Sequence, residues 1–447
     1  MIFPHIPRGR AAAFLVLVSL LALQPVSARA GYASVFGIGA ESISTGSTSF
    51  LHGEPTPFNA YGNPALLGYL SKAELALAVM STDVNLLAFG RVVVNESGTF
   101  GTFDTSGVLG GRGQMIGLGI PLGKPSRPLT IGVVAYFSSD SVSRVSGPPV
   151  NQPFYPIYND TARNAAYTVS AGYRIWNGLS VGFAANTSLI SVADYRIVNA
   201  TGGSFSASTV EVKSAFSPGY ALSYDFKKGS PEGEGIPLTL GLMRRGKSEL
   251  KTKLKANAEV QGIPVIGELT SFPHFSPAEW VETTSYQFSP VTTVALEIAR
   301  IEWSEYKNPV GTGNLNSFVF GNGNESAGFK DVTVPRVGVQ HKLFANGLVK
   351  EYALRAGYFF YPSPVPNQTG NSNFADSDRH AFSGGLGLGV LNPWMEEDSL
   401  LHIDLFAQYN KLASRKVVKN RPTDLGGPGY TIGGNIWVYG LQTRLEF

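Results

Sequence analysis

Alternating apolar and polar residues mark the end of the chain. Counted back from the last residue, one set of alternate positions is apolar or aromatic apart from a single threonine: Phe447, Leu445, Thr443, Leu441, Tyr439 and Trp437. The positions between them carry Glu446, Arg444, Gln442 and Gly440. A period of two residues is that of a β-strand whose two faces meet different environments. The pattern therefore predicts a terminal strand with one apolar face and one polar face.

The same alternation recurs along most of the chain and predicts 14 strands. It is clear at 400–410, 350–360 and 292–299, and it fails past Arg300, where a bulge or the edge of a bilayer would explain the break. The strands are expected near 73–95, 112–121, 128–138, 165–175, 179–198, 209–226, 236–248, 278–288, 291–306, 331–343, 349–361, 379–390, 399–411 and 434–447. An even number of such strands is typical of outer-membrane barrels, in which lipid-facing apolar residues alternate with polar residues that line the lumen.

The connections between these strands alternate in length. Long connections are expected at 96–111, 139–164, 249–277, 307–330, 362–378 and 412–433. Short ones fall at 122–127, 176–178, 289–290, 344–348 and 391–398, while 199–208 and 227–235 are intermediate. Short periplasmic turns and long external loops are what an antiparallel barrel requires, whereas a soluble sandwich has no reason to sort its loops in this way.

The first 30 residues predict a secretory signal peptide. Arg8 and Arg10 precede an apolar run at 11–23, and Ala28-Arg29-Ala30 provides a small-residue site for cleavage before Gly31. The run is shorter than the ~20 residues of a spanning helix, although an uncleaved anchor is the alternative. Residues 1–30 hold three arginines and no acid, so 32 of the 35 basic residues remain against 32 acids. The exported chain is then neutral, which argues against a nucleic-acid partner.

Residues 31–72 do not alternate and are rich in glycine and small side chains. A segment too irregular to span lipid has to lie in the periplasm or inside the lumen. We interpret it as a plug, or hatch, inside a barrel formed by residues 73–447; a disordered periplasmic leader is the alternative.

The composition agrees with this division of the chain. Charged residues make up 15% of the chain, below the ~25% of ordinary soluble domains, and aromatic residues make up 11%. The 447 residues include no cysteine, which excludes disulfide scaffolds, thiolate metal sites and cysteine nucleophiles. The prediction is an all-β, 14-stranded antiparallel transmembrane barrel in the outer membrane of a Gram-negative bacterium.

Several short motifs follow one another in a fixed order. They are Asn63-Pro64-Ala65-Leu66, Trp303-Ser304-Glu305-Tyr306, Gly328-Phe329-Lys330-Asp331, Arg355-Ala356-Gly357, Ser363-Pro364-Val365-Pro366 and Asp376-Ser377-Asp378-Arg379. Each is unspecific alone. Together they resemble the FadL/TodX family of outer-membrane transporters for hydrophobic compounds, most closely over 280–390. The resemblance is weak before about residue 160, except at the Asn-Pro-Ala motif.

The resemblance implies a route for the ligand. Long loops would capture it, a lumenal pocket would bind it, and it would leave sideways where the third strand is kinked inward against Asn63, Pro64 and Ala65. Gly132 is the expected kink site, because glycine tolerates a distorted backbone. The implied ligands are long-chain fatty acids or aromatic hydrocarbons. By position we expect Lys330, and with a looser alignment Arg196, to bind a carboxylate; otherwise each is a lumenal ion-pair member or a loop charge.

The enzyme signals in the sequence are weak. Residues 241–248 fit the phosphate-binding pattern G-x-x-x-x-G-K-S, but no β-α repeats surround them, so we expect a strand that runs into a loop. The six histidines are scattered, and no nucleophile elbow is present. Asp376 and Asp378 are residue types that bind calcium, although a structural loop network is the preferred interpretation. Glu396, Glu397 and Asp398 are expected to be a solvated acidic turn.

We therefore expect a passive, non-enzymatic channel with no cofactor and no bound metal. Its expected partners are a hydrophobic ligand, outer-membrane lipid with lipopolysaccharide, and the barrel assembly machinery; we expect a monomer. Phe447, Leu445 and Tyr439 are predicted to form the assembly signal. The alternatives are a structural or adhesive barrel and a secreted soluble all-β lipid-binding protein or hydrolase.

Overall fold

The computed structural model describes most of the chain after the expected signal peptide. The described residues are 33–94, 98–103, 108, 110–123, 128–138, 152–158, 165–199, 204–230, 235–260, 263–308, 310–315, 318–320, 326–392 and 399–447. The predicted signal peptide at 1–30 and the predicted acidic turn at 396–398 lie outside these ranges.

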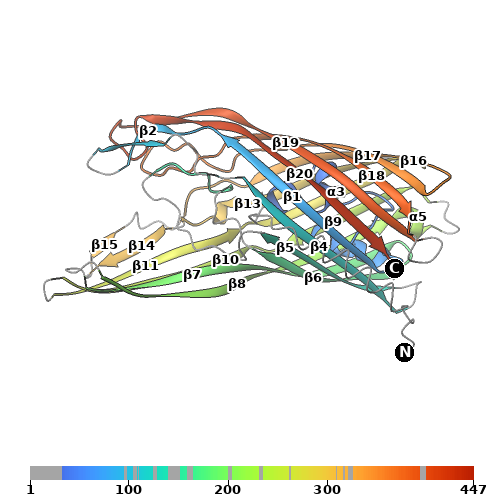
Figure 1. The fold of residues 1–447 in the computed structure, drawn as a ribbon, viewed down its shortest axis with the longest axis horizontal. Coiled ribbons are helices and arrows are strands. Elements are labelled where there is room, and N and C mark those ends of the chain that lie inside the picture. Colours follow the sequence, from blue (N-terminus) through green and yellow to red (C-terminus); the bar gives the residue numbers. More distant parts are fainter. Residues whose placement is uncertain are drawn as a thin grey trace.

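Fourteen antiparallel strands close into a barrel (Figure 1), which confirms the predicted fold class. In hydrogen-bonding order they are β1 (Glu74–Leu86), β20 (Gly429–Glu446), β19 (Leu400–Val418), β18 (Arg379–Leu391), β17 (Val349–Tyr361), β16 (Val332–Phe344), β13 (Thr292–Glu302), β12 (Ala278–Ser289), β9 (Leu238–Arg245), β8 (Ser204–Asp225), β7 (Leu179–Asn199), β6 (Ala166–Trp176), β5 (Leu129–Ser138) and β4 (Gly111–Leu122). Strand β4 pairs with β1 and so closes the ring.

Some predicted boundaries are wrong. The first predicted strand, 73–95, divides into β1, which ends at Leu86, and a separate strand β2 (Gly90–Val93), whose first residue Gly90 has a positive φ of 69°. Strand β2 pairs with β3 (Phe100–Phe103) outside the barrel. The strand predicted at 291–306 ends at Glu302, where the short helix η4 (Trp303–Glu305) begins. The loss of alternation past Arg300 marks this strand end.

Two segments predicted as long loops contain strands of their own. Strands β10 (Ser248–Val260), β11 (Ile263–Ser276), β14 (Val310–Leu315) and β15 (Phe318–Phe320) form a second sheet. Figure 1 shows this sheet beyond one end of the barrel, beside extended parts of β7 and β8. Those two strands have 21 and 22 residues, whereas about 9–11 residues span a bilayer, so they continue past it. The short helix α5 (Phe226–Gly229) follows β8 at the opposite end.

Side chains alternate between the two faces of the wall as the sequence predicts. On β19, Leu405 and Tyr409 face outward, while Asp404, Gln408 and Asn410 are buried toward the lumen. On β20, Trp437 and Tyr439 are exposed outward, and Gln442 is fully buried inward. The outer surface is therefore apolar and aromatic, and the inner wall carries most of the polar groups.

The N-terminal segment, residues 33–72, lies against the inner faces of the barrel strands. It contains α2 (Ala33–Phe36), α3 (Ala40–Ser44), α4 (Asn59–Gly62) and the 3-10 helix η1 (Pro64–Tyr69). Phe36, Ile43, Ala60 and Leu67 are fully buried in the same cluster as Met80 and Met115 of the wall. None of the helices in the described ranges is long and apolar enough to cross a membrane.

Candidate functional site

The Asn-Pro-Ala motif begins a tight 3-10 helix. The side-chain oxygen of Asn63 accepts a hydrogen bond of 3.2 Å from the amide of Ala65, and Pro64 occupies the first helical position, where no backbone donor is needed. Asn63, Pro64 and Ala65 are all buried. The motif therefore fixes how helix η1 lies inside the barrel.

Helix η1 contacts a glycine patch of the wall, formed by Gly132, Gly172 and Gly182. A Cβ atom added at Gly132 on β5 would lie 2.6 Å from Cδ1 of Leu67 and 2.8 Å from Cβ of Ala60. One added at Gly172 on β6 would lie 2.4 Å from the carbonyl oxygen of Pro64, and one at Gly182 on β7 would lie 2.3 Å from the amide nitrogen of Ala65. Gly172 and Gly182 thus allow the backbone of η1 to pack directly on β6 and β7, and Gly132 makes room on β5 for the side chains of Leu67 and Ala60.

The pairing of β5 is unbroken at Gly132, the expected kink site. Strand β5 pairs with β4 from Leu129 to Ser138 and with β6 from Leu129 to Tyr136, and neither register shifts at Gly132. The glycine is needed for the close approach of Leu67 and Ala60. A missing side chain is compatible with either role, so the sequence did not distinguish them.

Arginines of the wall hold the N-terminal segment. Arg245 on β9 donates to the Tyr61 hydroxyl at 2.9 Å, and Arg336 on β16 donates to the Ser47 carbonyl at 3.0 Å. Arg444 on β20 lies 3.5 Å from a carboxylate oxygen of Glu41, at the far side of the lumen. Each is also paired with a carboxylate of the barrel: Arg245 with Glu279 at 2.5 Å, Arg336 with Glu297 at 2.6 Å and Arg444 with Glu74 at 3.0 Å. The segment is thus attached by polar bonds that require particular geometry.

A small cavity separates the N-terminal segment from the wall near two of these arginines, Arg245 and Arg336. It has a volume of about 50 Å³. Its apolar lining includes Ile38, Met243, Val281 and Phe359, and its polar lining includes Arg245, Arg336 and Arg379. Such a volume holds a few water molecules but is far below the ~300–1,000 Å³ of ordinary ligand pockets. A ligand of any length would require the segment to move.

Arg379 is the most unusual residue of this cavity. It is 1% exposed, and its guanidinium lies 5.0 Å from the ring of Phe359 and 4.9 Å from that of Tyr361. Nη2 donates to the carbonyl of Val35 at 3.0 Å, whereas Nε and Nη1 have no hydrogen-bond partner. A buried cation with open donors is suited to an anionic or hydroxyl group. In the sequence this residue stands out only as part of a motif, and no pattern assigned it to a site.

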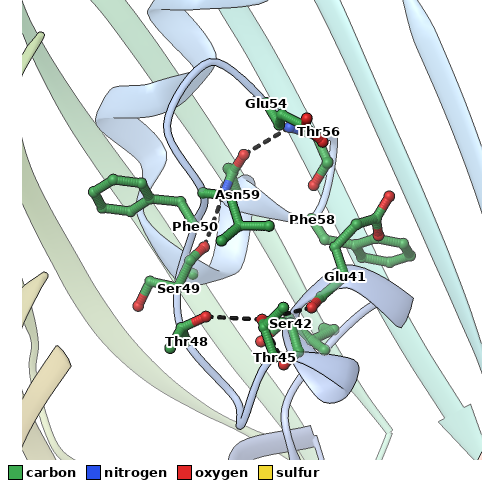
Figure 2. A pocket seen from close by; sticks show the side chains of 13 residues that line it. Glu41, Ser42, Thr45, Thr48, Ser49, Phe50, Glu54, Thr56, Phe58 and Asn59 are labelled. Atoms are coloured by element: carbon green, nitrogen blue, oxygen red, sulfur yellow. Dashed lines mark hydrogen bonds between the residues drawn. The ribbon is translucent and has the colours of Figure 1, made fainter. Parts of the chain in front are cut away.

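A second cavity, of about 30 Å³, lies within the N-terminal segment itself (Figure 2). Asn59 stands between Phe50 and Phe58 there, and its side chain bonds the backbone of Ser49 and Thr56. Burial disfavours ionisation of Glu41 at the cavity edge, but the charges of Arg444 and Arg355 and a hydrogen bond from Gln442 together hold its pKa below the usual value. The cavity therefore holds hydrogen-bonding and charged groups beside the apolar side chains of Ile38, Phe50 and Phe58.

Lys330 does not face a sheltered pocket. Its side chain is exposed, and its amide donates to the carbonyl of Pro364 at 2.9 Å. The neighbouring Phe329 is buried instead and stacks on Tyr306 with ring centroids 4.4 Å apart. The predicted carboxylate-binding role in a dry site is thus not supported for Lys330, because this motif buries its phenylalanine beneath the loops.

The other predicted ligand residue, Arg196, lies in β7 where the pairing with β8 is irregular. Its side chain lies outside the described part of the structure. Phe447 and Tyr439 are both about half exposed on the outside of the barrel, Leu445 is largely covered, and the Phe447 amide donates to Ala73 at 2.9 Å. Their role in assembly stays a prediction.

The end of the barrel with short turns is open. Two cavities of about 570 and 580 Å³ lie there, and both are lined by Gly53, Arg174 and Lys228. The first is also bordered by Glu74 and Glu446. This mouth therefore carries charges of both signs beside apolar residues such as Leu70 and Leu122.

The weak enzyme signals do not assemble into a site. The residues that fit the phosphate-binding pattern run from β9 through a turn into β10, with no helix to bind phosphate. Asp376 accepts from the Ser363 hydroxyl at 2.7 Å and Asp378 from the Ser363 amide at 2.8 Å, so both belong to a loop network. Within the described ranges, no group of three histidine or acidic side chains is placed to hold a metal ion.

Comparison with known sequences identifies a family and a full-length relative. Residues 163–447 match the sequence model of one family, described as outer membrane protein transport protein (OMPP1/FadL/TodX). Alkane uptake protein A of Marinobacter nauticus is 24% identical over 462 aligned positions, which cover 96% of this chain and 94% of that protein.

Solved structures share the architecture. A Pseudomonas aeruginosa FadL homologue superposes with a TM-score of 0.56 at 16% identity, covering 95% of this chain and 99% of that one. The toluene transporter TodX of Pseudomonas putida gives a TM-score of 0.54 at 15% identity, covering 92% and 99%. The toluene transporter TbuX of Ralstonia pickettii gives 0.53 at 13%, covering 92% and 99%. At these identities the likeness concerns the fold alone.

Proposed function

Because this chain belongs to the outer membrane transport protein family (OMPP1/FadL/TodX), we propose that it admits hydrophobic small molecules through the outer membrane of a Gram-negative bacterium. The full-length relative is an alkane uptake protein. An apolar solute does not cross a polar saccharide layer readily by partitioning, so a sheltered passage is useful to the cell. We propose passive transport with no cofactor, by a mature chain that follows cleavage before Gly31.

The observation that carries this proposal is the position of the N-terminal segment. Its helices contact the inner faces of the barrel strands and leave a cavity of about 50 Å³ between the wall and themselves. We propose that the segment is a plug that a ligand displaces, since the polar contacts that hold it can be exchanged for water at modest cost. A soluble protein or a purely adhesive barrel has no need of such a segment.

The exit of the ligand is a separate matter. The family resemblance implies a lateral opening at a kink of the third strand, but β5 is paired on both sides through Gly132. Lateral release would therefore require η1 to withdraw from the glycine patch first. Movement of the plug is then the common step of any route.

The lining of the cavity suggests how ligand classes are distinguished. We propose that a fatty acid places its carboxylate against Nε and Nη1 of Arg379, with its chain along Met243 and Val281. An alkane or an aromatic hydrocarbon would use the apolar lining alone. Arg379 thus takes the role that the family resemblance implied for Lys330.

The test is uptake by cells that lack their own transporter and express this chain. Labelled hexadecane, palmitate and toluene are supplied outside, and the initial rate of cell-associated label is measured. We expect a rate well above that of cells expressing an unrelated porin for at least one of the three. No increase for any of them would overturn the proposal.

Arg379→Met and Lys330→Gln separate the ligand classes. Methionine fills the space beside the rings of Phe359 and Tyr361 without a charge. Palmitate uptake should therefore fall about tenfold or more, while hydrocarbon uptake is retained. Lys330→Gln should change neither, because Lys330 is exposed. Equal palmitate rates in the wild type and Arg379→Met would remove Arg379 from the ligand site and leave the transport function intact.

A further inference from the structure

A row of aromatic residues crosses four strands on the outside of the barrel. Tyr358 on β17 pairs with Phe382 on β18, Phe382 pairs with Tyr409 on β19, and Tyr409 pairs with Trp437 on β20. The rings touch in two pairs, with centroids 5.2 Å apart for Tyr358 and Phe382 and 4.8 Å apart for Tyr409 and Trp437. Aromatic rows of this kind lie at the boundary between acyl chains and head groups.

Two lysines follow this row on β19, toward the end of the barrel that carries the long loops. Lys411 is two residues beyond Tyr409 on the same outward face, and it pairs across the sheet with His380 and Asn435. Lys411 lies ten residues after Leu401. At the rise of a strand tilted by about 40°, this separation is roughly 25 Å along the barrel axis, which equals the height of the apolar band of an outer-membrane barrel. Lys411 therefore stands where the head groups begin.

A bulge brings Lys416 onto the same face. Its odd spacing from Lys411 would turn the side chain toward the lumen in a regular strand. The register between β19 and β20 shifts between Leu412 and Arg415, which inserts one extra residue. Arg415 consequently points inward, where it donates to the carbonyl of Val365 at 2.9 Å, and Lys416 is exposed outward.

Neither lysine is neutralised in the structure. In the described ranges no ion pair joins Lys411 or Lys416 to a carboxylate, and the outward positions of β18, β19 and β20 hold no acidic residue. The outward arginines on another side of the barrel differ: Arg244 forms an ion pair with Glu302 at 2.8 Å, and Arg300 lies 3.8 Å from Asp331. The positive charge on β19 is thus available to a partner outside the barrel.

We propose that Lys411 and Lys416, above the aromatic row, form a binding site for a phosphate-bearing glycolipid of the outer leaflet, that is, the lipid A part of lipopolysaccharide. The acyl chains would contact Phe382 and Trp437, and the phosphates would pair with the two ammonium groups. The two lysines are about 10 Å apart in height, within a single head-group layer. This inference rests on the outer face of the barrel and is independent of the transported compound.

The test uses the full-length mature protein in a nonionic detergent, titrated with diphosphoryl lipid A and analysed by native mass spectrometry. The variants are the double substitution Lys411→Gln/Lys416→Gln, its conservative counterpart Lys411→Arg/Lys416→Arg, and the control Lys350→Gln at the opposite end of β17. We expect saturable binding by the wild type, a loss of about tenfold or more in the glutamine variant, and wild-type affinity in the other two. A difference in gel mobility between unheated and heated samples of each variant confirms that its barrel is folded.

Two further ligands distinguish the sources of the effect. Lipid A stripped of its phosphates should bind the wild type and the glutamine variant equally weakly, and inorganic phosphate should not compete at millimolar concentration. Equal binding of diphosphoryl lipid A by the wild type and the glutamine variant would overturn the proposal. The proposal would also be overturned if the glutamine variant lost as much affinity for the stripped lipid as for diphosphoryl lipid A. Displacement of bound lipid A by inorganic phosphate would overturn it as well.

Discussion

Arg245 of the wall binds Tyr61 of the N-terminal segment in three ways at once. Its Nη1 donates to the tyrosine hydroxyl at 2.9 Å, its Nη2 donates to the tyrosine carbonyl at 2.8 Å, and its guanidinium carbon lies 3.8 Å from the ring centroid. Only a planar, forked cation makes these contacts together. This pair fixes the helix that precedes the Asn-Pro-Ala motif.

Replacing Arg245 with lysine should loosen the segment while leaving the barrel folded. Lysine keeps a charge beside Glu279 but loses the fork and the stacking, at a cost of about 1–3 kcal/mol. Hydrogen exchange of residues 59–70 should accelerate accordingly. Arg244→Lys is the matched control, because Arg244 faces outward and pairs with Glu302. Equal exchange rates in both variants would show that Arg245 does not hold the segment.

A disulfide between the segment and the wall should block uptake. The chain has no cysteine, and a Cβ at Gly68 would lie 3.3 Å from Cβ of Ser180 on β7, close to disulfide geometry. We expect Gly68→Cys/Ser180→Cys to transport only after reduction. The control pair Gly219→Cys/Ala184→Cys joins two wall strands at 3.1 Å and should transport under both conditions. Full uptake by the oxidised first pair would mean that the segment does not move.

Substituting Gly132 should disturb the contact with η1. An added methyl would lie within 3 Å of Leu67, Ala60 and Ser170, so Gly132→Ala should lower stability by about 1–3 kcal/mol through overpacking. Gly347→Ala carries the same change into a turn where nothing lies within 4 Å, and it should be neutral. Thermal unfolding in detergent measures both. Equal midpoints would show that the wall yields at Gly132.

The loop that contains Asp376 should become less stable as the pH rises. Burial raises the pKa of Asp376 to about 7, although Ser363 and Arg379 act in the opposite direction. Because the folded pKa exceeds the unfolded value of 3.8, the folded loop binds the proton more tightly, and stability falls as the pH rises from 3.8 to about 7. The loss is up to about 4 kcal/mol.

Limited proteolysis of residues 362–378 at pH 5 and pH 8 checks this expectation. The wild-type loop should be cleaved faster at pH 8, after correction for the activity of the protease. Asp376→Asn keeps an acceptor for Ser363 without a titratable group, so its cleavage should not depend on pH. A pH-independent wild type would show that the carboxyl is already ionised at pH 5.

The sequence by itself determined the barrel, the number of its strands and, wherever the strands are regular, the face on which a side chain lies; the bulge that turns Lys416 outward was not visible in it. These features follow from a period of two residues, which is visible in each short stretch of the chain. The period arises because one face of each strand contacts lipid and the other faces the lumen. The alternation of long and short connections likewise needed no knowledge of distant contacts. The strands of the second sheet could not be predicted from this period, because they lie outside the membrane and lack a consistently lipid-facing side.

The tertiary structure alone decided which residues meet inside the lumen. Gly172 and Gly182 resemble any other glycines until η1 is placed upon them, and Arg379 is recognised as a buried cation only by its aromatic neighbours. Lys330 shows the converse, because a position in a motif does not reveal whether the side chain points into a pocket or into water. Such contacts join residues hundreds of positions apart, so no local period encodes them; they arise when the ring closes around the segment that it contains.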